Sequence, residues 1–395
     1  EATQAFTANT SVPTVSIGMG ALSFKRPDGK FLIVTANSGI SSSTTNIYDP
    51  VANTFVAGPN LASVTGTTGA GEGAASVPLP NGRVLIMHGG ATSMSSVYDP
   101  VNNSMSPGPQ PHLTNEATVT TVGAGSMFIP RLNGTYLFIP GMVNTMTPGI
   151  VGQSCTAART TTNIFNPYTM TFSVVGSPVA TGGTGPGAFA FQRKDGQWVI
   201  VRGGATAASC ASVATTLLYD PRSSSGSTSG TLVAGPTFAA MAPGPGGHAI
   251  PRPDGTWLIV PGYPIMATST ALNVGTTTTN IYMEESGAVT SIGDQGSIGT
   301  FIAGPAFITR LGTGATSFQR ADGKFVTIAG AATTTTGTDV HVYDAGWVAS
   351  GIYKSEQLDM SPLGTKLNSN SSLVWKANMA TTPTGGVSAE VRTAR

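Results

Sequence analysis

Residues 71–109 have the sequence GEGAASVPLPNGRVLIMHGGATSMSSVYDPVNNSMSPGP, in which four short stretches with strand-like composition are separated by turn residues. The four stretches are Gly73–Leu79, Arg83–Met87, Ser95–Tyr98 and the segment that runs through Met105 to Gly108-Pro109. Asn81-Gly82, between the first two, suits the φ > 0 positions of a type I′ hairpin turn. Short stretches bounded by such turns indicate β-strands. Residues 71–109 therefore predict one four-stranded antiparallel sheet.

The same pattern occurs six times along the chain of 395 residues. Each copy begins with Gly-x-Gly, and the glycine pairs are Gly18/Gly20, Gly71/Gly73, Gly123/Gly125, Gly185/Gly187, Gly244/Gly246 and Gly312/Gly314. The first turn starts eight residues after the second glycine, at Asp28, Asn81, Asn133, Asp195, Asp254 and Asp322. A repeat of this length made of several short strands indicates a radial or stacked all-β array. Strands rather than helices follow the glycines, so we attribute them to close backbone approach at a crowded centre and not to dinucleotide binding.

Apolar and aromatic residues recur at fixed places in each copy. The second stretch is an apolar run such as Phe31–Val34 or Trp198–Val201, which is typical of a strand buried on both faces. Gly89-Gly90 with Tyr98-Asp99-Pro100, and the same arrangement after Gly203-Gly204, resembles the kelch repeat in its galactose-oxidase-like form. The resemblance implies an all-β fold, a single six-bladed kelch-like β-propeller at residues 18–360; a seventh blade is the alternative. The tryptophan typical of the fourth kelch strand is replaced in this chain, by Phe55 and Met105 in the first two repeats.

The two ends of the chain differ from the repeats. Residues 1–17 contain Phe6 and align loosely with a fourth strand, so they form either a ring-closing strand or an N-terminal arm. Residues 361–395 resemble the opening strands of a β-sandwich module, and we expect a C-terminal β-hairpin there. The apolar residues Leu373, Trp375, Val387, Ala389 and Val391 are the candidate assembly interface. The hairpin packs on its own propeller, or it pairs with another copy of the chain by strand addition.

Composition limits the partners and the chemistry. Only 9% of residues are charged, the net charge is +1 and no basic cluster occurs, which argues against nucleic-acid binding. No run of eighteen apolar residues exists, so we expect no membrane span. Cys155 and Cys210 follow the second strand of neighbouring repeats, and we expect a disulfide between them, with two free thiols as the alternative.

No catalytic or metal-binding set is complete in the sequence. Galactose-oxidase-like copper enzymes need a tyrosine linked to a cysteine, a second tyrosine and two histidines, and this set is not assembled in the repeats. His248 is the best ligand candidate, while His88 and His341 lie within strands and suit structural roles. Of the acids, Glu72 and Glu116 lie near strand entries, and Glu72 is expected to face the central channel. We expect no cofactor, no metal and no catalytic residues.

An arginine precedes the first turn in five repeats, at Arg26, Arg131, Arg193, Arg252 and Arg320. These arginines form either a ring of positive charge on one face or local contacts that hold the turns. Length variation concentrates in the loops after the second and fourth strands, and we expect partner contacts on that face.

Together these observations predict a non-enzymatic extracellular or cell-surface structural or interaction propeller, a homo-oligomer that assembles through its terminal strands into a filament or sheath. Four Asn-x-Ser/Thr sequons, at Asn9, Asn102, Asn133 and Asn370, make surface glycans a second class of partner. The alternative is a galactose-oxidase-like or other carbohydrate-active secreted enzyme, or a glycan-binding, lectin-like propeller.

Overall fold

A computed structural model of the chain forms two compact units, residues 1–349 and 350–395. The structure describes residues 6–8, 17–18, 20–36, 43–62, 69–90, 92–111, 122–142, 162–174, 183–204, 212–222, 231–238, 243–263, 277–284, 299–307, 312, 314–320, 323–330 and 340–344. All of them belong to the first unit. Among them the regular elements are β-strands, and no helix occurs.

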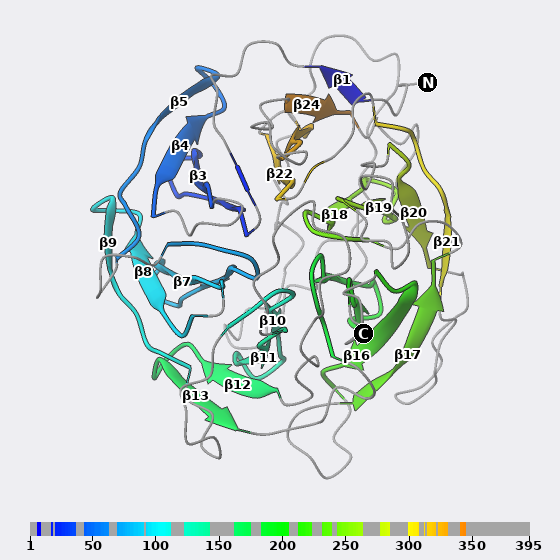
Figure 1. The fold of residues 1–395 in the computed structure, drawn as a ribbon, viewed down its shortest axis with the longest axis horizontal. Helices are drawn as coiled ribbons and strands as arrows, with labels where there is room; N and C mark the ends of the chain where they lie inside the picture. The colour runs from blue at the N-terminus through cyan, green and yellow to red at the C-terminus, as the bar shows by residue number, and fades with distance from the viewer. Residues whose placement is uncertain are drawn as a thin grey trace, which may run out of the picture. The chain divides into compact units, whose positions relative to one another are not determined.

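Six four-stranded antiparallel sheets make up the described part of the chain and are arranged as a ring (Figure 1). Blade 1 consists of β2 (Leu22–Lys25), β3 (Phe31–Val34), β4 (Thr45–Asp49) and β5 (Thr54–Ala57), and blade 2 of β6 (Ala75–Pro78), β7 (Val84–Met87), β8 (Ser95–Asp99) and β9 (Ser104–Pro107). Blade 3 consists of β10 (Met127–Pro130), β11 (Tyr136–Ile139), β12 (Asn163–Asn166) and β13 (Thr171–Val174), and blade 4 of β14 (Phe189–Gln192), β15 (Trp198–Val201), β16 (Thr215–Asp220) and β17 (Thr231–Thr237). Blade 5 consists of β18 (His248–Pro251), β19 (Trp257–Val260), β20 (Asn280–Met283) and β21 (Thr300–Ala303), and blade 6 of β22 (Thr316–Gln319), β23 (Phe325–Ile328), β24 (Val340–Tyr343) and β1 (Phe6–Ala8). The prediction of a six-bladed all-β propeller is confirmed.

The N-terminal strand completes the last blade. β1 pairs antiparallel with β24, and Phe6 lies opposite Tyr343 (Figure 1). The Phe6 ring stacks on Phe307 and Tyr343, with centroids 3.6 and 4.8 Å apart. The first strand of the chain therefore closes the ring, which ties blade 6 to a segment more than 300 residues earlier in the sequence.

The repeated glycines lie at the centre, where neighbouring blades touch. Gly73 has φ 80°, and a Cβ atom there would overlap the carbonyl of Gly123 in the next blade. The same contact joins Gly20 to Gly71, Gly125 to Gly185, Gly187 to Gly244 and Gly246 to Gly312. The explanation of the Gly-x-Gly elements by close backbone approach is confirmed.

The turn between the first two strands of a blade is not type I′, and that expectation is wrong. In blade 2, Gly82 has φ 78°, whereas the φ of Asn81 is not positive. The Gly82 amide donates to the Leu79 carbonyl, and the Leu79 amide donates to the Arg83 carbonyl. This is the pattern of a three-residue loop with a left-handed glycine. The Asn81 side chain explains the difference, because its Oδ1 accepts the Arg83 amide at 3.1 Å and holds the residue in the right-handed region.

Apolar clusters fill the spaces between blades. Between blades 1 and 2, for example, buried Leu32 and Ile47 pack with Ile86 and Tyr98. Comparable clusters lie at the five other interfaces, including the one between blades 6 and 1. The second strand of each blade contributes to the apolar clusters on both of its sides, and its sequence is therefore a continuous apolar run.

Candidate interaction face

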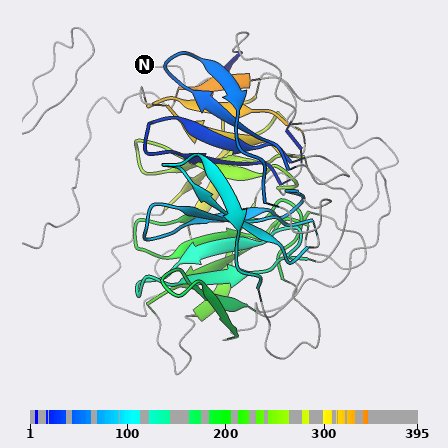
Figure 2. The same ribbon diagram turned by 90° about the vertical axis from the view of Figure 1, so that its left-hand side faces the viewer.

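The short connections between strands one and two and between strands three and four lie on one face of the ring, which we call the turn face (Figure 2). In blades 1–3 an Asp or Asn ends the third strand and caps the second of these turns. Asp99 Oδ1 accepts the amides of Val101 and Asn102 at 3.0 and 3.2 Å. Asp49 and Asn166 do the same in their blades. The loops after strands two and four lie largely outside the described residues, so partner contacts on that face stay a prediction.

The arginines of the turn face are held in local contacts. Arg26, Arg193 and Arg252 form ion pairs with the aspartate two residues later, at 3.1, 3.0 and 3.3 Å. Arg131 donates to Thr135 Oγ1 at 3.0 Å. Arg193 and Arg252 are only 6% and 8% exposed. A ring of exposed positive charge is therefore wrong for these four, and the turn-holding alternative is correct.

The same arginines reach the next blade. The Arg26 Cζ lies 6.0 Å from the centre of the Tyr98 ring, and its Nη1 donates to Asn103 Oδ1 at 3.0 Å. Burial raises the pKa of Tyr98, and the neighbouring Arg26 charge opposes that rise. The same opposition of burial and an arginine from the preceding blade acts on the pKa of Tyr219, Tyr282 and Tyr343. The sequence pattern identified the arginines but not these partners.

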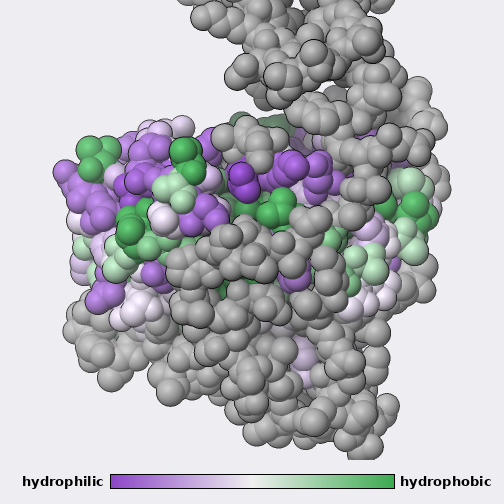
Figure 3. All heavy atoms as spheres, turned by 90° about the horizontal axis from the view of Figure 1, so that it is seen from above, coloured by the Kyte–Doolittle hydropathy of each residue, from purple (hydrophilic) through white to green (hydrophobic). Residues whose placement is uncertain are grey.

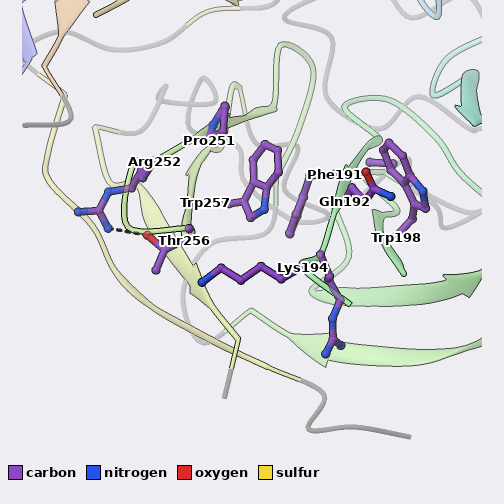
Figure 4. A pocket seen from close by; sticks show the side chains of 11 residues that line it. Phe191, Gln192, Lys194, Trp198, Pro251, Arg252, Thr256 and Trp257 are labelled. Atoms are coloured by element: carbon purple, nitrogen blue, oxygen red, sulfur yellow. Dashed lines mark hydrogen bonds between the residues drawn. The ribbon is translucent and has the colours of Figure 1, made fainter. Parts of the chain in front are cut away.

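A groove of about 390 Å³ opens on the turn face between blades 4 and 5 (Figure 4). Its lining includes Phe191, Gln192, Lys194, Trp198 and Trp257. Trp257 packs beside Phe191 with ring centroids 5.3 Å apart, and Figure 4 shows Trp198 on the other side, next to Gln192. The signal in the sequence is that, of the six repeats, only the fourth and fifth start the second strand with tryptophan.

Two of the three cations around this groove are held in ion pairs. The Arg193–Asp195 and Arg252–Asp254 ion pairs flank it. Lys194 extends over Gly255 of the next blade, and its Nζ lies 3.5 Å from the Asp254 carbonyl. The Lys194 amide donates to Glu284 Oε1 at 2.6 Å. Three cations and three carboxylates therefore surround an aromatic floor.

A second groove, of about 280 Å³, occupies the equivalent place between blades 1 and 2. Phe24, Arg26, Leu79, Val84 and Tyr98 contribute to its lining. Val84 starts the second strand of blade 2, where blade 5 has Trp257. The two grooves thus share a position and differ in their aromatic content.

Exposed apolar side chains recur at the tips of blades 1–3. Val51, Val101 and Tyr168 occupy the same turn position in successive blades and are 92%, 86% and 71% exposed. Leu132, in the first turn of blade 3, is 75% exposed. In the view of Figure 3, hydrophobic residues stand among hydrophilic ones at the edge of the described surface. These tips are the most solvent-exposed large apolar groups in the described part of the chain.

Two of the candidate residues for chemistry, His248 and His88, make hydrogen bonds within the fold. His248 Nδ1 donates to the Gly246 carbonyl at 2.9 Å, so Nε2 accepts from Ser317 Oγ at 2.6 Å. Burial lowers the pKa of His248 to about 4, although the Gly246 carbonyl opposes this. His88 contacts Ser96 Oγ at 2.7 Å, and burial lowers its pKa to about 4 as well. His341 and Glu72 are buried, and Glu116 lies outside the described residues.

Several predicted residues fall outside the part that the structure describes. They are Cys155 and Cys210 of the expected disulfide, and Leu373, Trp375, Val387, Ala389 and Val391 of the expected assembly interface. Of the sequons, Asn102 and Asn133 are described and exposed on the turn face. Among the described residues there is no helix long and apolar enough to cross a membrane.

No protein-family model matches the sequence, and no curated protein matches it. The class of protein shown by the fold is therefore a six-bladed β-propeller, with four antiparallel strands in each blade.

Proposed function

We propose that this chain is a non-enzymatic interaction β-propeller of the kelch, galactose-oxidase-like type, exposed outside the cell, which assembles with further copies of itself. The kelch assignment is supported by the Gly-Gly and Tyr-Asp-Pro elements, which bound the second and third strands of blade 2. The exposed sequons at Asn102 and Asn133 agree with an extracellular location.

The observation that carries the interaction function is the row of apolar tips. Val51, Val101 and Tyr168 leave most of their side-chain surface in water, at one position of three consecutive blades. Burying such groups against a partner is favourable by about 25 cal/mol per Å² of apolar surface. Repetition at one position makes a spaced set of contacts that one partner surface can meet.

A second copy of the chain is the partner that the charges favour. Beside the tips, Lys30 pairs with Asp49 at 3.0 Å and Arg83 with Asp99 at 3.2 Å. Because the charges on this face are paired within one chain, two copies can approach each other through this face without like-charge repulsion. β1 is already used in ring closure, so the C-terminal segment is the terminal strand left for donation to a neighbour, as the sequence predicts.

Light scattering coupled to size-exclusion chromatography at micromolar to millimolar concentration tests the proposal. We expect the full chain to form an oligomer, and the variants Val51→Asp with Val101→Asp, or deletion of residues 384–395, to reduce it to a folded monomer. Ile302→Asp, at a 43% exposed apolar position on the outer strand of blade 5, is the matched control and leaves the mass unchanged. A monodisperse monomer for the full chain contradicts self-assembly. Stoichiometric copper in the purified protein favours the enzyme alternative instead.

A further inference from the structure

We propose that the groove between blades 4 and 5 binds an uncharged pyranose oligosaccharide, with Trp257 as the stacking surface and Gln192 and Lys194 as polar contacts. This site is independent of self-assembly, because the apolar tips belong to blades 1–3. It would add a ligand-binding role to the structural one.

The size and lining of the groove suit a small organic ligand. A volume of about 390 Å³ lies within the range typical of ligand sites, which are mainly apolar and aromatic with a few placed polar groups. Trp257 is half-buried, and Phe191 packs against it at 5.3 Å and holds its orientation. The aromatic surface is therefore preorganised before a ligand arrives, which lowers the entropic cost of binding.

The chemistry of the rim distinguishes a sugar from other ligands. A pyranose has a face of C–H groups, which the electron-rich face of an indole attracts, and an edge of hydroxyls that both donate and accept hydrogen bonds. The exposed Gln192 amide can also do both. The Lys194 ammonium has three donors, and among the described residues it makes one hydrogen bond, a long one of 3.5 Å to the Asp254 carbonyl.

Charge balance favours an uncharged ligand. Arg193 and Arg252 are already paired with Asp195 and Asp254, and the Glu284 carboxylate lies beside Lys194. An acidic sugar or a phosphate therefore gains no net attraction and loses hydration on entering. Aromatic grooves also bind proline-rich peptides. Such a peptide presents carbonyl acceptors but few hydrogen-bond donors, so it would leave the carbonyl and amide oxygens of this rim without partners.

The equivalent groove between blades 1 and 2 is an internal control. It has the same position and a lysine, Lys25, but Val84 stands where blade 5 has Trp257. If stacking on tryptophan drives binding, substitutions in that groove leave the affinity unchanged.

Isothermal titration of the full chain with cellohexaose, N-acetylchitohexaose and β-1,4-mannohexaose tests the proposal. A heparin hexasaccharide and a proline decapeptide serve as the charged and peptide probes. We expect at least one neutral hexasaccharide to bind with one site per chain and to quench tryptophan fluorescence. Trp257→Ala should weaken it about tenfold, in line with the loss of one aromatic contact. Trp257→Phe should weaken it less, and Gln192→Ala, at an exposed position, should weaken it several-fold without changing the melting temperature.

The matched control is Phe24→Leu in the blade 1–2 groove, which should bind as the unsubstituted protein does. The proposal is overturned if no neutral hexasaccharide binds at 10 mM ligand, a concentration of about 10 times a millimolar Kd. It is also overturned if heparin or the proline peptide binds more tightly than every neutral sugar. The proposal is also contradicted if folded variants bind with the affinity of the unsubstituted protein, namely Trp257→Ala together with either Gln192→Ala or Trp257→Phe. The mass of the assembly, measured in parallel, reports on self-association separately.

Discussion

The two interfaces on either side of blade 2 both contain an apolar cluster, but they differ in the polarity of three equivalent residues near the turn face. Between blades 1 and 2, Arg26 and Tyr98 both donate to Asn103 Oδ1, at 3.0 Å each. Between blades 2 and 3, the equivalent positions are Leu79, Phe165 and Met170, which pack in one apolar cluster. All three positions change together, so each interface is internally consistent. A propeller interface thus tolerates either a polar or an apolar set, but the members must match.

The comparison teaches why one position cannot be read alone. Arg26 is stable at the end of the first strand because Asp28 lies two residues later and Asn103 lies in a turn of the next blade. Blade 2 has Asn81 in place of the aspartate, and its neighbour offers Phe165 in place of tyrosine. A guanidinium at position 79 would have neither partner.

Breaking the apolar interface has the largest expected effect. Leu79→Arg places a charge in a site that is 6% exposed and lined by Leu85, Val97 and Phe165. We expect a loss of about 3–5 kcal/mol in the free energy of unfolding, because the charge is buried without a partner. Urea denaturation measures it. Combining Leu79→Arg with Asn81→Asp, Phe165→Tyr and Met170→Asn should recover part of the loss; no recovery would contradict the idea of matched sets. Leu79→Met is the control.

Acid should destabilise blade 2 through His88. Its side chain is fully buried, and burial lowers its pKa to about 4. The unfolded chain binds this proton near pH 6.5 and the folded chain only near 4, so stability is full above 6.5 and falls as the pH drops toward 4. A pKa difference of this size corresponds to about 3 kcal/mol.

Thermal melts of the unsubstituted protein and of His88→Gln between pH 7 and 4 measure this contribution. The variant should show a shallower decline of stability with falling pH, even if its stability at pH 7 is lower. Parallel declines for the two proteins would mean that His88 does not titrate as its burial implies.

Removing an arginine should cost more at a buried pair than at an exposed one. The Asp195 side chain is 9% exposed and that of Asp28 is 41% exposed. We expect Arg193→Ala to cost about 2–3 kcal/mol, because it leaves a buried carboxylate without its ion pair, and Arg26→Ala about 1 kcal/mol or less. Urea midpoints of the two variants test this order, and equal losses would contradict it. High salt should reduce the loss only for Arg26→Ala.

The smallest effect is expected from Tyr98→Phe. It deletes one hydrogen bond to Asn103 Oδ1 while the Arg26 guanidinium continues to donate to the same oxygen. We expect a loss of about 0.5 kcal/mol, at the low end for a hydrogen bond, because the acceptor keeps its other donor. Differential scanning calorimetry of Tyr98→Phe beside Arg26→Ala and the double variant gives their coupling. A double-variant loss equal to the sum of the single losses would show that the two donors act independently.

Much of the fold could be predicted because its signals are local. The glycine pairs, the turn residues and the apolar runs of about four residues repeat in order, and strands such as Phe31–Val34 and Trp198–Val201 begin and end where the apolar runs do. The turn type was missed because it depends on a side chain, Asn81, that binds the backbone two residues later. Cys155 and Cys210 lie in stretches without such repetition and outside the described residues, so the disulfide between them stays a prediction.

By itself, the sequence predicted six repeats of short strands with local turns and a glycine pair in each, because apolar runs and turn residues are features of residues close in the chain. It left open a seventh blade and the closing strand of blade 6. Only the tertiary structure decided what each side chain meets across an interface. The partners Arg26 and Asn103 are separated by 77 residues, and Lys194 meets Glu284 across 90. The groove lined by Trp257, and the choice between a polar and an apolar blade interface, depend on such contacts, which arise only when neighbouring blades are brought side by side.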